Sequence, residues 1–204
     1  VQDARLGMQA AHALRVLTLH SRLVSPSRGF VVRRLYRQRA METMLVALTK
    51  ELEGRRTARE PCLVAMATLL PGATDALVSM HLPTWLPLLV HTLGMDDAPV
   101  RLTCARTLQR IVSRDHAAAL LEHLPLLVPR LLEAAATPQA PRLRVAALQA
   151  LQALTDAVPA AHLDSYRRAV VQALGRPRRG VDDAVRAVRT AAVDCRAAWY
   201  ATQE

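Results

Sequence analysis

Three stretches of the chain begin with the same short motif, and this periodicity constrains the fold more than any other feature. His-Leu-Pro stands at residues 81–83 and 123–125, and His-Leu-Asp at 162–164, so the motif recurs after 42 and then 39 residues. Apolar residues at helical spacing follow each copy, and a break that contains Gly or Pro comes next. A second apolar stretch then opens with Val-Arg or Leu-Arg, at 100–101, 143–144 and 188–189. Each copy therefore predicts two helices joined by a turn.

Paired helices that recur every 40 or so residues are the pattern of HEAT repeats. One helical hairpin cannot bury its apolar stripe alone, whereas stacked hairpins share a continuous core. Small residues, such as Cys104, Ala105 and Ala147, would let the second helices pack closely. The predicted fold class is all-α, a HEAT-repeat α-solenoid of about four to five helical hairpins.

The same hairpin recurs upstream in a weaker form. The pattern predicts a long helix over residues 31–53 and a partner helix over 58–70. Residues 1–25 are interpreted as a partial helix of a preceding repeat, and 30–204 as a C-terminal HEAT-repeat domain. Because the chain opens at Val1 without a signal-peptide layout, we expect a fragment of a longer protein.

Charge is distributed unevenly along the chain. The net charge of +10 divides into +7 over residues 1–40, zero over 41–160 and +3 over 161–204. A surface for nucleic acid needs a sustained basic stripe, usually with aromatic residues for stacking, and aromatics are only 3% here. We therefore expect no direct nucleic-acid contact. No apolar run approaches the roughly 18 residues of a membrane span, so no membrane contact is expected either.

The cysteines and histidines do not form a recognisable metal motif. Three widely spaced cysteines fit a reducing compartment, and Cys104 and Cys195 are expected to be small buried hydrophobic residues. The histidines of the three motifs would lie about 10 Å apart along one edge of a solenoid. That spacing is too wide for a shared zinc ion, whose bonds to nitrogen are about 2.0–2.1 Å. We expect no metal and no cofactor, and interpret these histidines as polar residues just before a helix, with Pro83 and Pro125 at its first position.

One arginine recurs at the same position of the three second helices, as Arg101, Arg144 and Arg189. These residues could form a row of guanidinium groups suited to an acidic partner. They could also form a polar ladder between repeats, with Asp97 and Asp183 as candidate neighbours and Gln139 in place of an Asp in the middle repeat. We favour the structural interpretation and keep both.

The last helix carries the second of two tryptophans. Trp85 falls on the apolar stripe of its own helix and is expected in the core, whereas Trp199 and Tyr200 have no following repeat to cover them. With nearby arginines they would form a contact surface, because interfaces favour Trp, Tyr and Arg. The alternative, that a terminal helix folds its aromatics inward, is equally open. No nucleophile elbow or phosphate-binding glycine loop is found, so we expect no enzyme.

Several of these segments resemble a known family. The stretch Leu-Arg-Val-Ala-Ala-Leu-Gln-Ala-Leu-Gln-Ala-Leu-Thr at 143–155 is similar to a helix near the end of the large HEAT-repeat adaptor of the cytosolic iron–sulfur protein assembly (CIA) targeting complex. That family was first named for methyl-methanesulfonate sensitivity and nucleotide excision repair. Further similar segments follow in the same order at 166–174, 182–193 and 196–200, and one precedes them at 30–39.

The resemblance implies a non-enzymatic scaffold in the cytoplasm and nucleus. Its C-terminal repeats would dock a targeting subunit with a reactive cysteine and a WD40-propeller subunit. The full-length chain would present apo iron–sulfur clients, including DNA repair and replication enzymes, for insertion of a [4Fe–4S] cluster, and a homodimer stays open. We expect the docking residues to be Arg144, Arg186, Arg189, Arg196, Trp199 and Tyr200. The alternatives are a generic HEAT-repeat interaction scaffold and a nucleic-acid-binding helical repeat.

Overall fold

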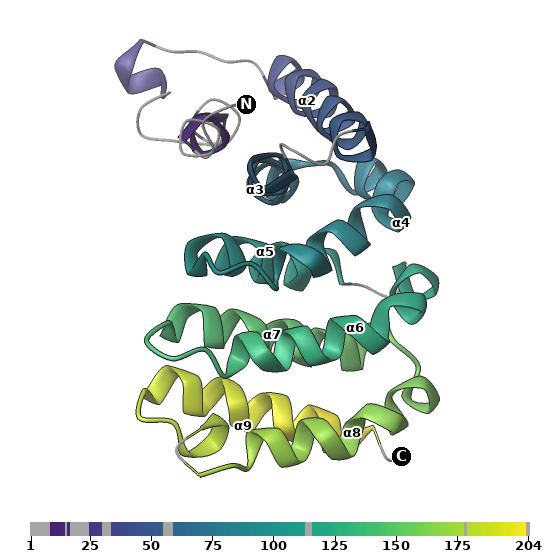
Figure 1. The fold of residues 1–204 in the computed structure, drawn as a ribbon, viewed down its shortest axis with the longest axis vertical. Helices are drawn as coiled ribbons and strands as arrows, with labels where there is room; N and C mark the ends of the chain where they lie inside the picture. Colours follow the sequence, from purple (N-terminus) through teal and green to yellow (C-terminus); the bar gives the residue numbers. More distant parts are fainter. Residues whose placement is uncertain are drawn as a thin grey trace. The chain divides into compact units, whose positions relative to one another are not determined.

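The computed structural model describes residues 9–14, 16, 25–29, 34–54, 59–112, 116–177 and 179–202, and every regular element among them is an α- or 3-10 helix (Figure 1). The chain divides into two compact units, Val1–Trp85 and Leu86–Glu204, and the division falls within one helix, α4. Among the described residues, no helix combines the length and the hydropathy that crossing a membrane requires.

The first unit contains a helical pair that the sequence predicts. Its elements are η1 (Pro26–Arg28), α2 (Arg34–Gly54), α3 (Arg59–Leu69), η2 (Leu70–Gly72) and most of α4 (Asp75–Thr92). The ring nitrogen of Trp85 donates to Thr49 Oγ1 at 2.8 Å, and this hydroxyl donates to Leu45 O at 2.8 Å. The fully buried indole thereby joins α4 to α2 with its polar group satisfied, and its predicted core position is confirmed.

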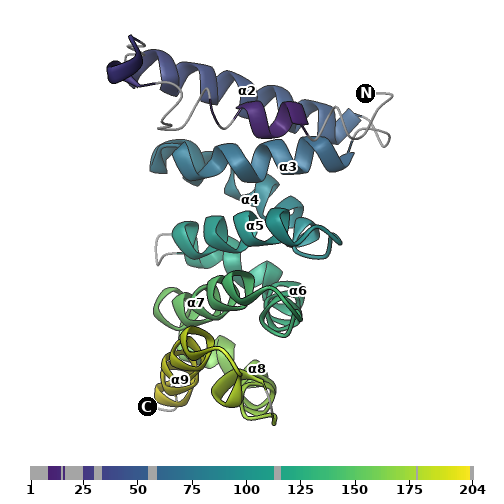
Figure 2. The same cartoon turned by 90° about the vertical axis from the view of Figure 1, so that its left-hand side faces the viewer.

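The second unit is a stack of helical pairs. Its further elements are α5 (Ala98–Ile111), α6 (Ala117–Ala135), α7 (Pro141–Ala157), α8 (Ala160–Leu174), η4 (Gly180–Asp182) and α9 (Arg186–Ala201). Helices α5, α7 and α9 pack against one another in a row, α6 packs on α7, and α8 packs on α9 (Figure 2). The predicted fold class, an all-α helical-repeat solenoid, is confirmed, while the predicted division at residues 25 and 30 stays a prediction.

Small side chains line the contacts within the row. Cys104 and Ala105 of α5, Ala147 of α7, and Ala192 and Cys195 of α9 are all fully buried. Because these side chains are short, the helix backbones can approach closely while leucines fill the space beside them.

The histidine motifs lie inside helices, so their predicted position before a helix start is wrong. Helix α4 begins six residues before His81, α6 six residues before His123, and α8 two residues before His162. The prolines that follow the first two histidines are therefore internal, and α6 continues through both Pro125 and Pro129. Both of these prolines are exposed, so the carbonyl groups that lose a backbone partner lie on the side where water can bind them.

The turn between α8 and α9 requires a glycine at residue 180. Gly180 is buried with φ +54°, and a Cβ there would lie 2.2 Å from Leu174 O. We predict that Gly180→Ala lowers the free energy of unfolding by at least about 2 kcal/mol, through the left-handed backbone and the clash. Gly175→Ala is the control, because Gly175 has φ −87° and the nearest atom to its Cβ would be Val171 O at 3.4 Å. Urea denaturation followed by circular dichroism measures both, and equal midpoints would contradict this account of the turn.

Candidate protein-docking surface

Five residues of α9 share one face of the helix. They are spaced three or four positions apart, which places side chains in a row along a helix. We call them the α9 strip: Arg186, Arg189, Val193, Arg196 and Tyr200. Val193 is 53% exposed and Tyr200 46% exposed, although both are large apolar or aromatic residues. A shallow groove of about 420 Å³ runs along part of the strip, lined by Val181, Arg186, Arg189, Thr190, Val193 and Asp194.

The C-terminal end of the strip is a paired cation and aromatic ring. The guanidinium carbon of Arg196 lies 5.4 Å from the centre of the Tyr200 ring, and its Nη2 donates to Tyr200 Oη at 3.3 Å. The pair keeps an amphipathic ring at the surface beside a positive charge. Tyr and Arg are the residue types that carry binding energy at many protein interfaces.

Arg189 also has a structural function. Its Nη1 donates to Asp183 O at 2.7 Å and to Ala184 O at 3.1 Å. These bonds hold the backbone that leads into α9, so Arg189 shapes the groove as well as lining it.

Trp199 lies in the core, so its predicted place on an exposed contact surface is wrong. The side chain is completely buried, and its ring nitrogen donates to Leu151 O of α7 at 3.0 Å. Trp199 shares a face of α9 with Val188, Ala192 and Cys195, which are also buried. Since adjacent residues of a helix point about 100° apart, Tyr200 faces solvent while Trp199 packs inward. The inward-folding alternative holds for the tryptophan alone.

Arg144 shares a partner, Asp183, with the strip residue Arg189 and takes part in a polar ladder. Its Nη2 donates to Asp183 Oδ1 at 3.1 Å, and its Nη1 donates to Thr137 O at 3.1 Å. The Asp183 oxygen also accepts from the Val185 N–H at 2.9 Å. An arginine of one repeat thus binds the turn of the next repeat. This is the contact that the structural interpretation of the recurring arginines predicts.

Among the described residues, no arginine makes such an ion pair at the two earlier turns, before α5 and before α7. The carboxylate of Asp97 instead accepts from the Val100 N–H at 3.0 Å and caps α5. Gln139, with φ +56°, stands in the turn before α7.

Sequence reasoning identified four of the five strip residues and missed Val193. The spacing could have identified Val193. It stands seven positions from both Arg186 and Tyr200, and residues at this spacing share one face of a helix. An exposed valine carries no chemical signature by itself, so only its exposure in the fold identifies it.

The cysteines are held as protonated thiols. Cys104 is buried, and its Sγ donates to Leu89 O at 3.0 Å. Burial raises the pKa of Cys104, and it raises the pKa of Cys195 to about 12. Burial is also the main cause that raises the pKa of the half-buried Cys62. Within the described ranges, no three His, Cys, Asp or Glu side chains are grouped to hold a metal ion.

Comparison with known proteins identifies the relatives of the chain. Residues 1–155 match a family model described as RNAPII transcription regulator C-terminal. The chain is 30% identical over 202 residues to the MMS19 nucleotide excision repair protein homolog of Bos taurus, and the match covers 98% of this chain. It is 25% identical over 197 residues (96% of the chain) to the DNA repair/transcription protein mms19 of Schizosaccharomyces pombe. It is 27% identical over 173 residues (83% of the chain) to a DNA repair/transcription protein of Saccharomyces cerevisiae that also carries the name MMS19. The chain spans 16–19% of the length of these relatives.

The ladder predicts a measurable coupling between two repeats. The side chains of Arg144 and Asp183 are only 12% and 8% exposed. A double-mutant cycle with Arg144→Ala and Asp183→Ala, measured by urea denaturation, should give a coupling energy of about 1–3 kcal/mol. The control is a cycle on Arg167 and Asp164, a pair within α8 whose aspartate is 58% exposed. That pair should contribute below about 1 kcal/mol. Equal coupling energies would show that the Arg144–Asp183 pair does not join the repeats.

Thiol reactivity tests the cysteine assignment. At pH 8 a thiol with a pKa near 12 carries far less thiolate than a free cysteine, whose pKa is about 8.5. We expect Cys104 and Cys195 to react with Ellman's reagent at least about 100-fold more slowly than free cysteine in the folded chain. Because a raised pKa favours the protonated form, the Cys195 rate should climb with pH up to about 12. All three cysteines should react rapidly in urea, and Cys62→Ala should remove the fastest native phase. Three equally fast native thiols would contradict the burial.

Proposed function

This chain belongs to the RNAPII transcription regulator C-terminal family, and we propose that it is an adaptor module that works in DNA repair and transcription by scaffolding. The observation that carries the proposal is the family match over residues 1–155, together with relatives that are named for repair and transcription. A solenoid with an exposed face on its last helix has the structure that docking needs.

The finer proposal is that the adaptor belongs to the CIA targeting complex. The resemblance of residues 143–155 and of the segments after it supports this assignment. In this proposal the terminal repeats dock the subunit with the reactive cysteine and the WD40-propeller subunit, and the longer protein presents apo iron–sulfur clients. Because the proposed clients include DNA repair and replication enzymes, we expect the adaptor to act in the cytoplasm and nucleus.

The α9 strip is the proposed docking surface. It combines two exposed apolar or aromatic side chains with three arginines on one face, and such a surface can bury its apolar part while its charges select the partner. Arg144 and Trp199 support the surface from within, because one fixes the turn before α9 and the other fixes α9 on α7.

Scaffolding supplies a physical mechanism without a catalytic group. When a donor subunit and a client bind the same chain, their encounter becomes intramolecular, at an effective concentration set by geometry. The raised pKa values of Cys104 and Cys195 agree with this mechanism, because a chain that only positions other proteins needs no reactive thiolate.

Co-purification with the two smaller targeting subunits tests the proposal. We expect the chain to co-elute with them in size-exclusion chromatography with light scattering. Arg186→Glu with Val193→Asp should abolish co-elution, because the two substitutions lower the net charge of the strip by three. Both residues are exposed, so the fold should be retained.

The matched control is Arg106→Glu with Gln149→Asp, which makes the same charge change at exposed positions of α5 and α7. This variant should bind normally. A folded wild-type chain that binds neither subunit would leave a generic HEAT-repeat scaffold. Normal binding by the strip variant would move the docking surface elsewhere.

A further inference from the structure

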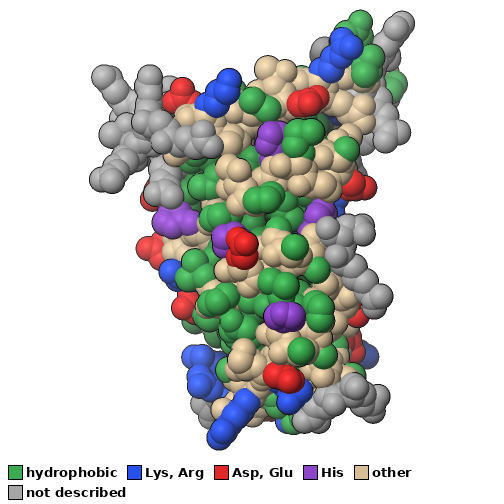
Figure 3. All heavy atoms as spheres, turned by 90° about the vertical axis from the view of Figure 1, so that its right-hand side faces the viewer, with side chains coloured by type: hydrophobic (Ala, Val, Ile, Leu, Met, Phe, Trp, Pro, Cys, Tyr) green, Lys and Arg blue, Asp and Glu red, His purple; other side chains and the backbone are tan. Residues whose placement is uncertain are grey.

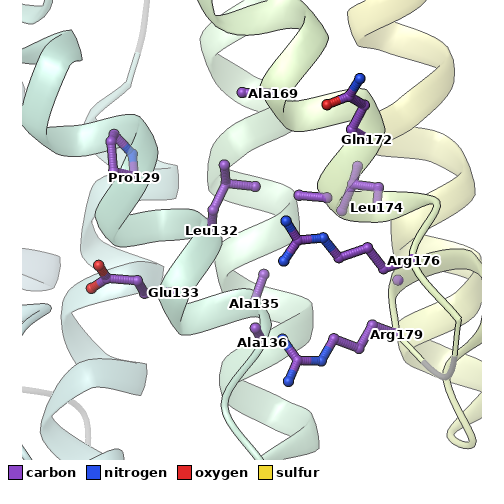
Figure 4. Close-up of a pocket in the computed structure, with 12 residues that line it drawn as sticks. Pro129, Leu132, Glu133, Ala135, Ala136, Ala169, Gln172, Leu174, Arg176 and Arg179 are labelled. Carbon is purple, nitrogen blue, oxygen red and sulfur yellow. The ribbon is translucent and has the colours of Figure 1, made fainter.

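A second concave site lies between α6 and α8. It has a volume of about 450 Å³, and it is lined on the α6 side by Pro129, Leu132, Glu133, Ala135 and Ala136. The opposite side consists of residues 169 and 172–174 of α8 and of Arg176, Arg179 and Gly180 from the following loop (Figure 4). We call it the α6/α8 pocket; it shares no residue with the strip.

Two arginines give the pocket its charge. The side chains of Arg176 and Arg179 extend from the loop after α8 toward the end of α6 (Figure 4). Both are exposed, and within the part of the chain that the structure describes neither makes an ion pair. Residues 165–181 contain five arginines and no acidic residue. The pocket therefore carries positive charge that its own lining does not neutralise.

Two backbone hydrogen bonds connect the residues around these arginines. The Arg179 N–H donates to Arg176 O at 3.2 Å, and the Asp182 N–H donates to Arg179 O at 3.0 Å. Gly180, which no larger residue could replace without a clash, forms the next part of this turn. This turn brings both arginines to the same side of the pocket.

The rest of the lining is apolar and small. Alanines and leucines form most of the floor, and Glu133 at the rim is paired with Arg130 at 2.9 Å. On the face in Figure 3, basic side chains gather at the lower end, at the level of α8. An apolar floor beside free guanidinium groups matches a ligand with an aliphatic side chain next to carboxylates.

We propose that the α6/α8 pocket binds an acidic segment of a protein partner, with an aliphatic side chain on the floor and carboxylates on Arg176 and Arg179. Among the described residues that line the pocket, none is aromatic, so the pocket offers no ring on which a base could stack. The apolar floor beside the two arginines therefore favours an acidic peptide with an aliphatic side chain over a nucleic acid. The site goes beyond the proposed docking of the targeting subunits and does not depend on it.

Fluorescence anisotropy with the whole chain tests the proposal. The probe is the fluorescein-labelled peptide Gly-Asp-Glu-Leu-Asp-Glu-Leu-Gly, compared with the same peptide in which Asn and Gln replace Asp and Glu. We expect the acidic peptide to bind and the neutral peptide to bind at least about tenfold more weakly. Arg176→Ala with Arg179→Ala should weaken binding of the acidic peptide by at least about tenfold, since two charge-assisted hydrogen bonds are lost.

Two further variants separate a site from general charge attraction. Arg142→Ala with Arg168→Ala removes the same charge at exposed positions outside the pocket, and should change the affinity by less than about twofold. Gln172→Trp fills the pocket from an exposed lining position without changing its charge, and should weaken binding.

Three results would overturn the proposal. The first is that the two double-arginine variants weaken binding of the acidic peptide equally. The second is that Gln172→Trp binds the acidic peptide normally. The third is tight binding of a thymidine 20-mer that depends on Arg176 and Arg179 while the acidic peptide does not bind, which would assign the pocket to nucleic acid.

Discussion

Close packing of the second helices is the constraint on which the second unit depends. Each helical pair has an apolar stripe that it cannot cover alone, and α7 is covered by α5 on one side and α9 on the other. Small residues at the contacts, such as Ala147 and Ala192, let the helices approach until the neighbouring leucines are excluded from water. The stability of each pair is therefore shared with its neighbours.

Polar contacts in the second unit join helices that this packing brings together. Arg144 reaches the turn of the next repeat and binds Asp183 where both side chains are nearly buried. Loss of either partner would leave the other charge buried and unpaired, which costs free energy. The pair therefore fixes the position of α7 relative to the turn before α9. Trp199 connects the same two helices through Leu151 O, and its buried N–H is satisfied by this bond.

The two faces of α9 differ in chemical character. Its inward face is formed by Val188, Cys195 and similar residues, while the α9 strip displays arginines, a valine and a tyrosine. The α6/α8 pocket arises differently, from the space between two first helices whose facing residues include four alanines. Two surfaces with different geometry and a shared positive charge thus lie in one unit.

The amino-acid sequence by itself determined the repeat, the helical pairs and the buried cysteines, because periodic apolar residues and small residues state which face of a helix must be covered. It placed the histidine motifs before the helices, whereas they lie within them. A proline can stand inside a helix when the carbonyl four residues before it, which loses its N–H partner, faces water. Only the tertiary structure decided that Trp199 packs inward while Tyr200 stays exposed. That difference depends on the rotation of α9 about its axis, which packing on α7 sets. The α6/α8 pocket likewise depends on the contact of α6 with α8 and its following loop, which are distant from α6 in sequence, so no local pattern could reveal it.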